Sequence, residues 1–168
     1  MSTHRATVSW KKEGDFARKK YHRAHTWHFD GGIALRAAAS PAVVPLPWTV
    51  EDAVDPEEAL VAAASSCHML TFLFLAANDG FVAETYLDEA EGHLRDGWLA
   101  DITLRPRISW AGTPPDAAQL EALHRRAHEG CFIARSLKSE IRVEAPRQSA
   151  ETPGSSRSGS SSPGSSNA

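Results

Sequence analysis

The longest apolar stretch of the chain lies in its middle third and contains no charged side chain. Its upstream end carries three signals that start a helix: Asp55 can accept hydrogen bonds from free backbone amides, Pro56 suits the first helical position, and Glu58 completes a capping box. Gly80 supplies the left-handed residue with which many helices end. The pattern therefore predicts one long helix over residues 55–78.

The same stretch has the apolar character of a membrane span, but two features argue against one. It covers only residues 61–77, and a helix needs about 20 residues to cross the hydrocarbon core of a bilayer. Polar side chains also interrupt it, so we expect a helix buried within protein and no association with a membrane. The interrupting residues are Ser65, Ser66, His68 and Thr71.

Short strand-like segments lie on both sides of this helix. Residues 6–11 open the chain, and residues 24–30 and 33–38 surround an Asp-Gly-Gly turn signal, which predicts a hairpin. Downstream, residues 81–95 and 98–111 are joined at an Asp-Gly pair and are expected to form a second, longer hairpin.

The remaining pattern predicts a second helix over residues 116–129 that stops at Gly130, and a last strand over residues 139–145. This order of elements indicates an α+β fold, with antiparallel sheets and two main helices on one side. We expect residues 1–146 to form the folded domain. Residues 147–168 are almost entirely Ser, Gly, Pro and small polar residues, so we expect them to form a disordered tail.

Composition and charge narrow the classes of function. A chain of 168 residues with 42% apolar content is long enough for one domain with a core, and too short to expect two. A net charge of -3 gives no electrostatic reason to expect nucleic-acid binding, which relies on clustered Lys and Arg. The start of the chain does not have the pattern of a secretory signal, so we expect a cytoplasmic protein.

The chain has two cysteines, and both fall in helical segments. Cys67 lies inside the long helix and Cys131 directly follows Gly130, so only folding can bring their thiols together. In a reducing cytoplasm two cysteines rarely form a permanent disulfide. Three alternatives stay open: inert buried thiols, metal ligands, or a pair that forms a transient catalytic disulfide.

Two short motifs surround these cysteines. They are Asp55-Pro56-Glu57-Glu58, followed by Cys67, and Ala127-His128-x-x-Cys131, followed by Ser136. Together they resemble the OsmC/Ohr family of peroxide-detoxifying proteins, in particular its OsmC-like members. The resemblance covers about residues 5–146. It implies an intertwined homodimer with active sites at the subunit interface, where a peroxidatic cysteine, a resolving cysteine, an arginine and a glutamate act together.

The residues that match the motifs of this family are Cys67, Cys131 and Glu57, and the arginine corresponds to Arg23. The second motif departs from the commonest pattern. Phe132 follows the cysteine where many members have proline, and Arg135 precedes Ser136 where asparagine is frequent. Both departures lie beside the proposed resolving cysteine, and a charged Arg135 near the site would affect which substrate enters it.

Thiol chemistry gives an independent reason to look for a cation. A cysteine thiol titrates near about 8.5, so a thiolate at neutral pH requires a shift of about 2 units, or roughly 2.7 kcal/mol. Cys67 lies beyond the reach of the helix dipole, and its helix contains no Lys or Arg. The cation must come from elsewhere in the fold, with Arg23 as first candidate and Arg18 and Arg36 next. Glu57 would hold the guanidinium through a bidentate contact.

Helix geometry limits how these residues meet. Glu57 and Cys67 are ten residues apart, which is about 15 Å along a straight helix, and they lie on different faces. They can share a site only if the helix bends near residues 59–64 or if Glu57 reaches the cysteine of another subunit. Two antiparallel copies of this apolar helix would satisfy the second option.

Histidine spacing allows two metal-site alternatives, neither of which we adopt. A row of His124, His128 and Cys131 could supply zinc ligands, but Gly130 interrupts the helix before the sulfur. Three histidines near the N-terminus alternate between the faces of a strand and cannot converge on one ion without a turn. They are His22, His25 and His28. We therefore predict no metal and no cofactor.

His68 directly follows Cys67, but on a helix its side chain points about 100° away. We expect it to be a hydrogen-bonding residue of the core or of an interface, and not a general base for Cys67. A cysteine hydrolase also requires oxyanion donors near the nucleophile, and the residues around Cys67 suggest none.

The sequence thus predicts a thiol-dependent peroxidase in which Cys67 attacks the peroxide and Cys131 resolves the sulfenic acid. The apolar residues near both cysteines favour an organic hydroperoxide over hydrogen peroxide. The resemblance implies a dithiol reductant, either a lipoyl group or a small thiol. The alternative is a non-catalytic, stress-associated dimer that binds a small apolar ligand in the same pocket.

Overall fold

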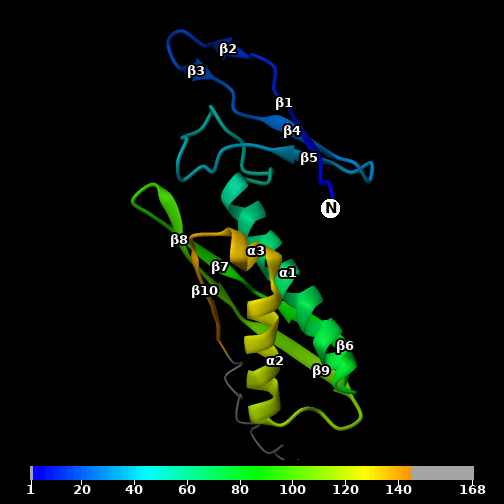
Figure 1. The fold of residues 1–168 in the computed structure, drawn as a ribbon. Coiled ribbons are helices and arrows are strands. Elements are labelled where there is room, and N and C mark those ends of the chain that lie inside the picture. The colour runs from blue at the N-terminus through cyan, green and yellow to red at the C-terminus, as the bar shows by residue number, and fades with distance from the viewer. Residues whose placement is uncertain (1, 145–168) are drawn as a thin grey trace, which may run out of the picture.

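The computed structural model describes residues 2–144 and has an α+β architecture in two parts (Figure 1). Residues 6–37 form small antiparallel sheets, which we call the N-terminal sheets. Residues 56–144 contain every helix of the described residues and a long hairpin, and we call them the helical body. The predicted tail over residues 147–168 lies outside the described residues and stays a prediction.

The first hairpin of the sequence prediction is confirmed. Strands β4 (His25–Phe29) and β5 (Ala34–Ala37) pair antiparallel, and β1 (Ala6–Ser9) pairs with the other edge of β4. Gly32 has a φ of 81°, which explains the glycine in this turn. Two further strands, β2 (Gly14–Asp15) and β3 (Lys20–Tyr21), form a short hairpin that the sequence did not predict.

The long helix is also confirmed, as α1 (Pro56–Asn78). Its capping box is complete, because Asp55 Oδ1 accepts from the Glu58 amide at 2.7 Å and Glu58 Oε2 accepts from the Asp55 amide at 3.1 Å. Gly80 follows the helix with a φ of 86°, as the sequence predicted. Local signals alone therefore determine both ends of this helix.

Only one stripe of α1 is buried within the chain. Its buried residues recur every four positions, as Ala64, His68, Phe72 and Ala76. On another side of the helix Leu70 is 62% exposed and Phe74 is 65% exposed. Among the described residues α1 is the one helix long and apolar enough to cross a membrane. The sequence predicted a helix buried within protein, but in the single chain only one face of α1 is buried.

The second hairpin forms with one interruption. Strands β7 (Glu91–Arg95) and β8 (Trp98–Leu104) pair around the predicted Asp-Gly turn, and β6 (Val82–Asp88) pairs with β9 (Pro106–Ala111) further along. At the interruption, the Asp88 carboxylate accepts from the Arg105 amide at 2.6 Å. The last strand, β10 (Glu140–Val143), lies parallel to β8.

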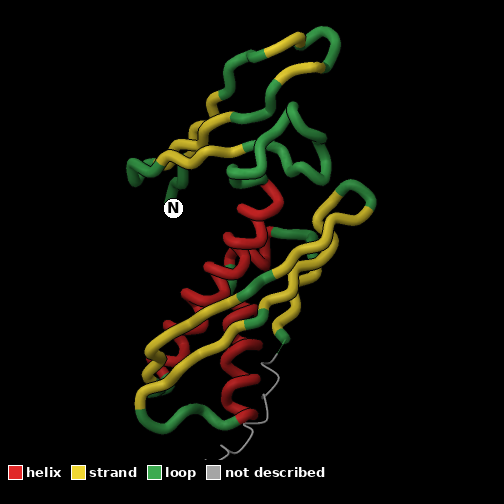
Figure 2. Tube along the Cα trace, turned by 180° about the vertical axis from the view of Figure 1, so that it is seen from behind, coloured by secondary structure: helices red, strands yellow, loops and turns green. Residues whose placement is uncertain are grey.

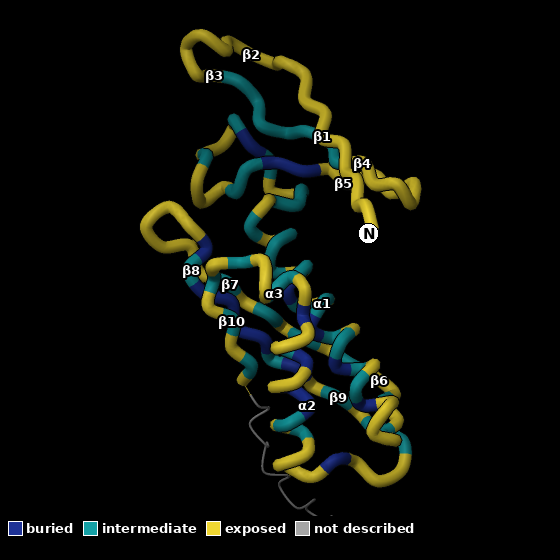
Figure 3. The backbone as a smooth tube through the Cα atoms, in the orientation of Figure 1, coloured by how far each residue is buried: buried dark blue, intermediate teal, exposed yellow. Residues whose placement is uncertain are grey.

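The second predicted helix is α2 (Ala117–Gly130), and a short helix that was not predicted, α3 (Phe132–Ser136), follows it. Seen from behind, the long hairpin lies across α1 and α2, so both helices cover one of its faces (Figure 2). Buried residues gather between these layers (Figure 3). The larger buried apolar side chains there are Phe72, Leu99, Ile102, Leu104 and Leu123.

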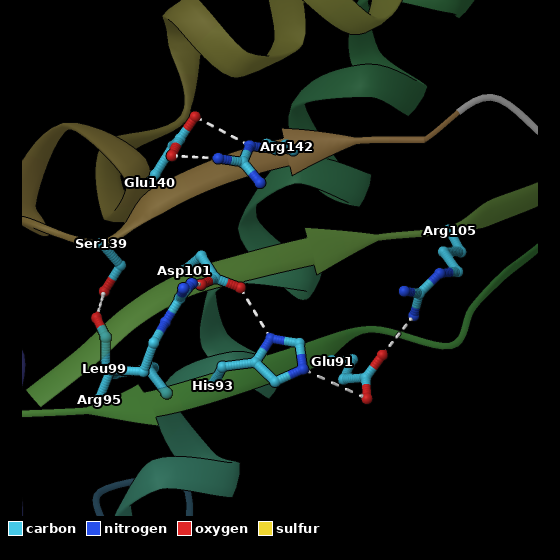
Figure 4. A network of polar contacts seen from close by, with 9 residues as sticks. All are labelled: Glu91, His93, Arg95, Leu99, Asp101, Arg105, Ser139, Glu140 and Arg142. Carbon is cyan, nitrogen blue, oxygen red and sulfur yellow. Dashed lines mark hydrogen bonds and ion pairs between the residues drawn. The ribbon is translucent and has the colours of Figure 1, made fainter.

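The face of the hairpin away from the helices is polar. Ile102 and Leu104 point into the core, so the alternating residue Asp101 points outward. It accepts from His93 Nδ1 at 2.7 Å and pairs with Arg95 (Figure 4). Neighbouring strands add further ion pairs, so charged side chains cover this face. They are Glu91, Arg105, Glu140, Arg142 and Glu144.

Candidate active site

The fold brings the two cysteine thiols together. Cys67 lies in the middle of α1 and is half-buried, whereas Cys131 is 1% exposed at the junction of α2 and α3. Both are free thiols. Burial raises the pKa of the Cys131 thiol, and the hydrogen bond with the adjacent Cys67 thiol raises it further. Cys131 is therefore held as a protonated thiol directly beside Cys67.

The junction between the helices places Cys131 in this position. Its backbone ends α2, and its Sγ accepts from the Ala134 amide at 3.4 Å, so the same residue caps the start of α3. Gly130 allows the end of α2 to approach α1, because a Cβ there would lie 3.0 Å from Cγ2 of Thr71. The Thr71 hydroxyl in turn donates to the Cys67 carbonyl at 2.9 Å.

Cys67 lines an open, mainly apolar pocket of about 500 Å³. Three large side chains at this pocket are strongly exposed, because Phe132 keeps 77%, Phe74 65% and Leu70 62% of its surface in solvent. Within residues 2–144 none of the lining residues carries a charge. The lining residues are Ala63, Ser66, Cys67, Leu70, Thr71, Phe74, Gly130 and Phe132.

Glu57 does not lie at this pocket. It is in the first turn of α1 and lines a different pocket of about 710 Å³, together with Ser65 and Asp88. The helix is continuous from Pro56 to Asn78, so no break in it folds Glu57 back towards Cys67. Of the two arrangements that the sequence allowed, only a contribution from another subunit remains compatible with a shared site.

Arg23 also lies away from Cys67. It follows β3 in the N-terminal sheets, where its guanidinium stacks 3.8 Å above the ring of Tyr21 and donates to the Tyr21 carbonyl. The alternative arginines lie in the same part of the chain. Arg18 pairs with Asp15 at 3.7 Å, and Arg36 pairs with Asp52. Within one chain, the structure thus joins the two cysteines but joins neither of them to Arg23 or Glu57.

Two histidines of the helical body form a pair that the sequence did not reveal. His68 Nε2 and His124 Nδ1 lie 3.1 Å apart, and the two rings stack with centroids 5.4 Å apart. Burial lowers the pKa of His68 to about 4, with a further contribution from His124, and burial lowers the pKa of His124 to about 4 as well. Both are neutral at pH 7, and His68 is a core hydrogen-bonding residue as predicted.

This pair also bears on the metal-site alternatives. His124 faces His68 across the interface between α1 and α2, and does not join Cys131 in a ligand set. No group of three metal-binding side chains occurs in residues 2–144. The signal for the pair was present but not decisive, because each histidine lies on the buried stripe of its own helix and only packing matches the two stripes.

Comparisons with known proteins agree with this architecture. Residues 49–145 match the family model described as OsmC-like protein. A solved structure of an OsmC-like protein of unknown function from Vibrio cholerae is 48% identical, with a TM-score of 0.81, and the match covers 86% of this chain and 99% of that one. No curated protein sequence matches this chain.

More distant structures share the fold. An organic hydroperoxide resistance protein from Legionella pneumophila is 18% identical with a TM-score of 0.59, and the match covers 87% of this chain and 96% of that one. The organic hydroperoxide resistance protein OhrB of Bacillus subtilis is 16% identical with a TM-score of 0.55, over 86% of this chain and 97% of that one. The matched motifs, the α+β fold and the family model together place this chain in the family of OsmC-like proteins.

Proposed function

We propose that this protein is a thiol-dependent peroxidase that reduces organic hydroperoxides through Cys67 and Cys131. The observation that carries the proposal is the proximity of two free thiols beside an open apolar pocket. Family membership makes a peroxide-related stress function the expected one. A buried structural cysteine needs neither the second thiol nor the pocket.

The different surroundings of the two cysteines suggest their roles. Cys67 lines the pocket, so a peroxide can reach its sulfur, whereas Cys131 is 1% exposed and its pKa is raised by burial. The Cys67 thiolate attacks a peroxide oxygen, the O–O bond breaks, and the alkoxide leaves as an alcohol after gaining a proton. Cys67 is thereby oxidised to a sulfenic acid, and the peroxide is reduced.

Resolution then uses the adjacent thiol. The Cys131 sulfur attacks the Cys67 sulfur, an S–S bond forms, and the hydroxyl leaves as water with the proton of Cys131. An external dithiol reduces this disulfide and is itself oxidised. We propose a lipoyl group or a small thiol as that reductant, and the cytoplasm as the compartment, because it keeps such thiols reduced.

The pocket walls favour an organic hydroperoxide. Leu70, Phe74 and Phe132 present apolar surface around Cys67, and the lining within residues 2–144 includes no charged side chain. An alkyl group gains roughly 25 cal/mol for each Å² of apolar surface that it removes from water, and hydrogen peroxide gains nothing comparable. Two distant relatives of the same fold are named organic hydroperoxide resistance proteins.

We further propose that the active protein is a homodimer in which a second copy completes the site. Within residues 2–144 no cation lines the pocket at Cys67, and Arg23 and Glu57 both lie elsewhere. The exposed side of α1 presents Leu70 and Phe74, which is the kind of apolar surface that another protein covers. A second copy packed on this side would bring its own Arg23 and Glu57 towards Cys67.

A second candidate function uses the same pocket. A non-catalytic dimer could bind a small apolar ligand between Leu70, Phe74 and Phe132, because the pocket of about 500 Å³ has the size and polarity of a small-molecule site. Ligand binding of this kind requires the apolar walls but neither thiol. Substitution of Cys67 therefore distinguishes the two functions.

The deciding experiment follows peroxide loss in the presence of dithiothreitol. Cumene hydroperoxide should be consumed at least about tenfold faster than hydrogen peroxide, since only the former buries apolar surface. Cys67→Ser should consume neither peroxide and is the matched control for non-specific reduction. Equal, slow loss of both peroxides in the wild type and in Cys67→Ser would leave the ligand-binding function as the better account.

A further inference from the structure

We propose that His25 is a positioning residue for the arginine that activates Cys67. His25 Nδ1 forms a hydrogen bond with the main-chain carbonyl of Arg23 at 2.8 Å. The indole N–H of Trp27 donates to His25 Nε2, also at 2.8 Å. Trp27, His25 and Arg23 thus form one hydrogen-bonded chain. The inference rests on the proposed function, in which Arg23 stabilises the thiolate.

The partners of the ring determine where its proton lies. A main-chain carbonyl can only accept, so His25 Nδ1 must carry the hydrogen and donate to Arg23. An indole nitrogen can only donate, so His25 Nε2 must be unprotonated and accept from Trp27. Together the two contacts select the neutral imidazole with its hydrogen on Nδ1. Trp27 therefore orients the ring so that the hydrogen points at Arg23.

Arg23 needs such support because of its place in the fold. It lies between β3, which ends at Tyr21, and β4, which begins at His25, so no strand ladder holds it. Its amide donates to the Trp48 carbonyl at 2.9 Å, and its carbonyl accepts from His25. These two bonds fix both peptide groups of Arg23. The direction in which the side chain leaves the backbone is thereby set.

The guanidinium is held separately from the backbone. It stacks 3.8 Å above the Tyr21 ring and donates to the Tyr21 carbonyl. The Tyr21 ring itself packs against Phe16 and Trp10, with ring centroids 4.5 and 5.8 Å away. Tyr21 therefore determines the position of the guanidinium, and His25 fixes the backbone from which the Arg23 side chain extends. The electrostatic effect of a cation on a thiolate falls as their separation grows, so a loose anchor weakens activation.

The test measures Cys67 reactivity in a Cys131→Ser background, where only one thiol reacts. His25→Leu removes the hydrogen bond to Arg23, and we expect the rate constant for oxidation of Cys67 by cumene hydroperoxide to fall about tenfold. The pH midpoint of Cys67 alkylation should rise in the same variant. His25→Asn offers an amide N–H near the position of Nδ1 and should restore most of the rate.

Trp27→Phe tests the orientation of the ring without removing it. In the wild type, nitrogen-15 NMR of His25 should show a protonated Nδ1 and an unprotonated Nε2. In Trp27→Phe, Nε2 loses its donor, so we expect a mixture of the two neutral forms and a smaller fall in the oxidation rate. His28→Leu is the matched control, because His28 is an exposed histidine of the same strand, and it should change neither observable.

Arg23→Ala separates failure of this inference from failure of the proposed function. A normal oxidation rate in Arg23→Ala means that another cation activates Cys67, and the proposed role of Arg23 is then wrong. A slow Arg23→Ala together with a normal, folded His25→Leu overturns the role of His25 alone. If His25→Leu does not fold, Trp27→Phe decides the question, because unchanged NMR signals and rate in that variant also overturn the inference.

Discussion

The helical body and the N-terminal sheets differ in how much apolar surface they bury. The body has a continuous core that includes Phe72, Ile102, Leu104 and Leu123. The strands β1, β4 and β5 bury little, and only Ala37 among their residues is fully covered. Figure 3 shows this contrast, with dark blue segments concentrated in the body.

The two parts also divide the chemistry. The body carries both thiols, whereas the N-terminal sheets carry all three candidate cations, Arg18, Arg23 and Arg36. The aromatic side chains beside Arg23 are poorly covered, since Trp10 is 43% exposed and Phe16 is 52% exposed. A region that exposes this much apolar surface usually packs against another protein. The body positions both sulfurs within one chain. In the dimer that we propose, the N-terminal sheets of a second copy would supply the activating cation.

The largest effect should come from the thiols themselves. Cys67→Ser should abolish peroxide turnover, because Cys67 is the thiol that lines the pocket and Cys131 is 1% exposed. Cys131→Ser should leave one round of oxidation intact, after which Cys67 proceeds towards sulfinic acid because nothing resolves it. Mass spectrometry of peptides from peroxide-treated protein locates the added oxygens. Oxygen adducts on Cys131, or full activity in Cys67→Ser, would show that the roles are assigned to the wrong residues.

The second effect tests whether the exposed side of α1 is covered by another copy. Phe74→Glu adds a charge to a side chain that is 65% exposed in the single chain, so an isolated chain should tolerate it. A dimer that buries Phe74 should dissociate and lose most of its activity, because an unpaired charge in an interface is costly. Light scattering gives the mass. The control is Glu121→Lys on the exposed side of α2, and a dimeric, active Phe74→Glu protein contradicts the proposed interface.

The third effect concerns the cation from the N-terminal sheets. Arg23→Ala should raise the pH midpoint of Cys67 alkylation towards or above about 8.5, the value for an unassisted thiol. Glu57→Ala should shift the midpoint less and slow peroxide reduction more, because it frees the guanidinium without deleting its charge. Both are measured in a Cys131→Ser background. An unchanged midpoint in Arg23→Ala would direct attention to Arg18 or Arg36.

These regions also differ in how well the sequence predicted them. Both ends of α1 follow from Asp55, Glu58 and Gly80, which act within one or two helical turns. The short hairpin of β2 and β3 escaped prediction, although Gly14 has a φ of 93° and a Cβ there would lie 2.4 Å from the Lys20 carbonyl. A single glycine is a weak signal of a hairpin. Strands of two residues are also too short to show a pattern of alternating polar and apolar positions.

The candidate site shows the same division between local and distant information. The family motifs pointed to both cysteines as site residues, which stays a prediction, and the fold places their thiols near each other. The contact between His68 and His124 and the parallel pairing of β10 with β8 depend on how whole elements pack. No short pattern encodes such contacts, because they join residues far apart in the chain. The proposed contact of Arg23 and Glu57 with Cys67 would depend on a second chain, so it is still harder to predict from the sequence of one.

The fourth effect is on stability and belongs to the body alone. The pKa values of His68 and His124 are lowered from 6.5 to about 4, so between these values the unfolded chain binds protons that the folded chain does not. The free energy of unfolding should therefore fall as the pH falls from 6.5 towards 4, by up to about 1.4 kcal/mol per pH unit for each histidine. Urea denaturation at several pH values measures this slope.

A double variant tests the source of that slope. Replacing both histidines, as His68→Leu with His124→Leu, removes a hydrogen bond together with both of its partners, so the cost at pH 7 should be small. The outer nitrogens of the pair, His68 Nδ1 and His124 Nε2, have no hydrogen-bond partner within residues 2–144, which reduces the cost further. The pH slope should largely disappear. His28→Leu, in the N-terminal sheets, should keep it, and an undiminished slope in the double variant would assign it to other groups.

The smallest effect should come from residues 147–168, which lie outside the described residues. Their Ser, Gly and Pro content cannot bury enough apolar surface to offset the entropy of ordering the chain. Deleting them should change the melting temperature by less than about 2 °C and leave peroxide turnover intact. Calorimetry and the cumene hydroperoxide assay measure the two quantities. A large loss of stability would mean that this segment packs on the protein, and loss of activity alone would mean that it contacts the site at Cys67.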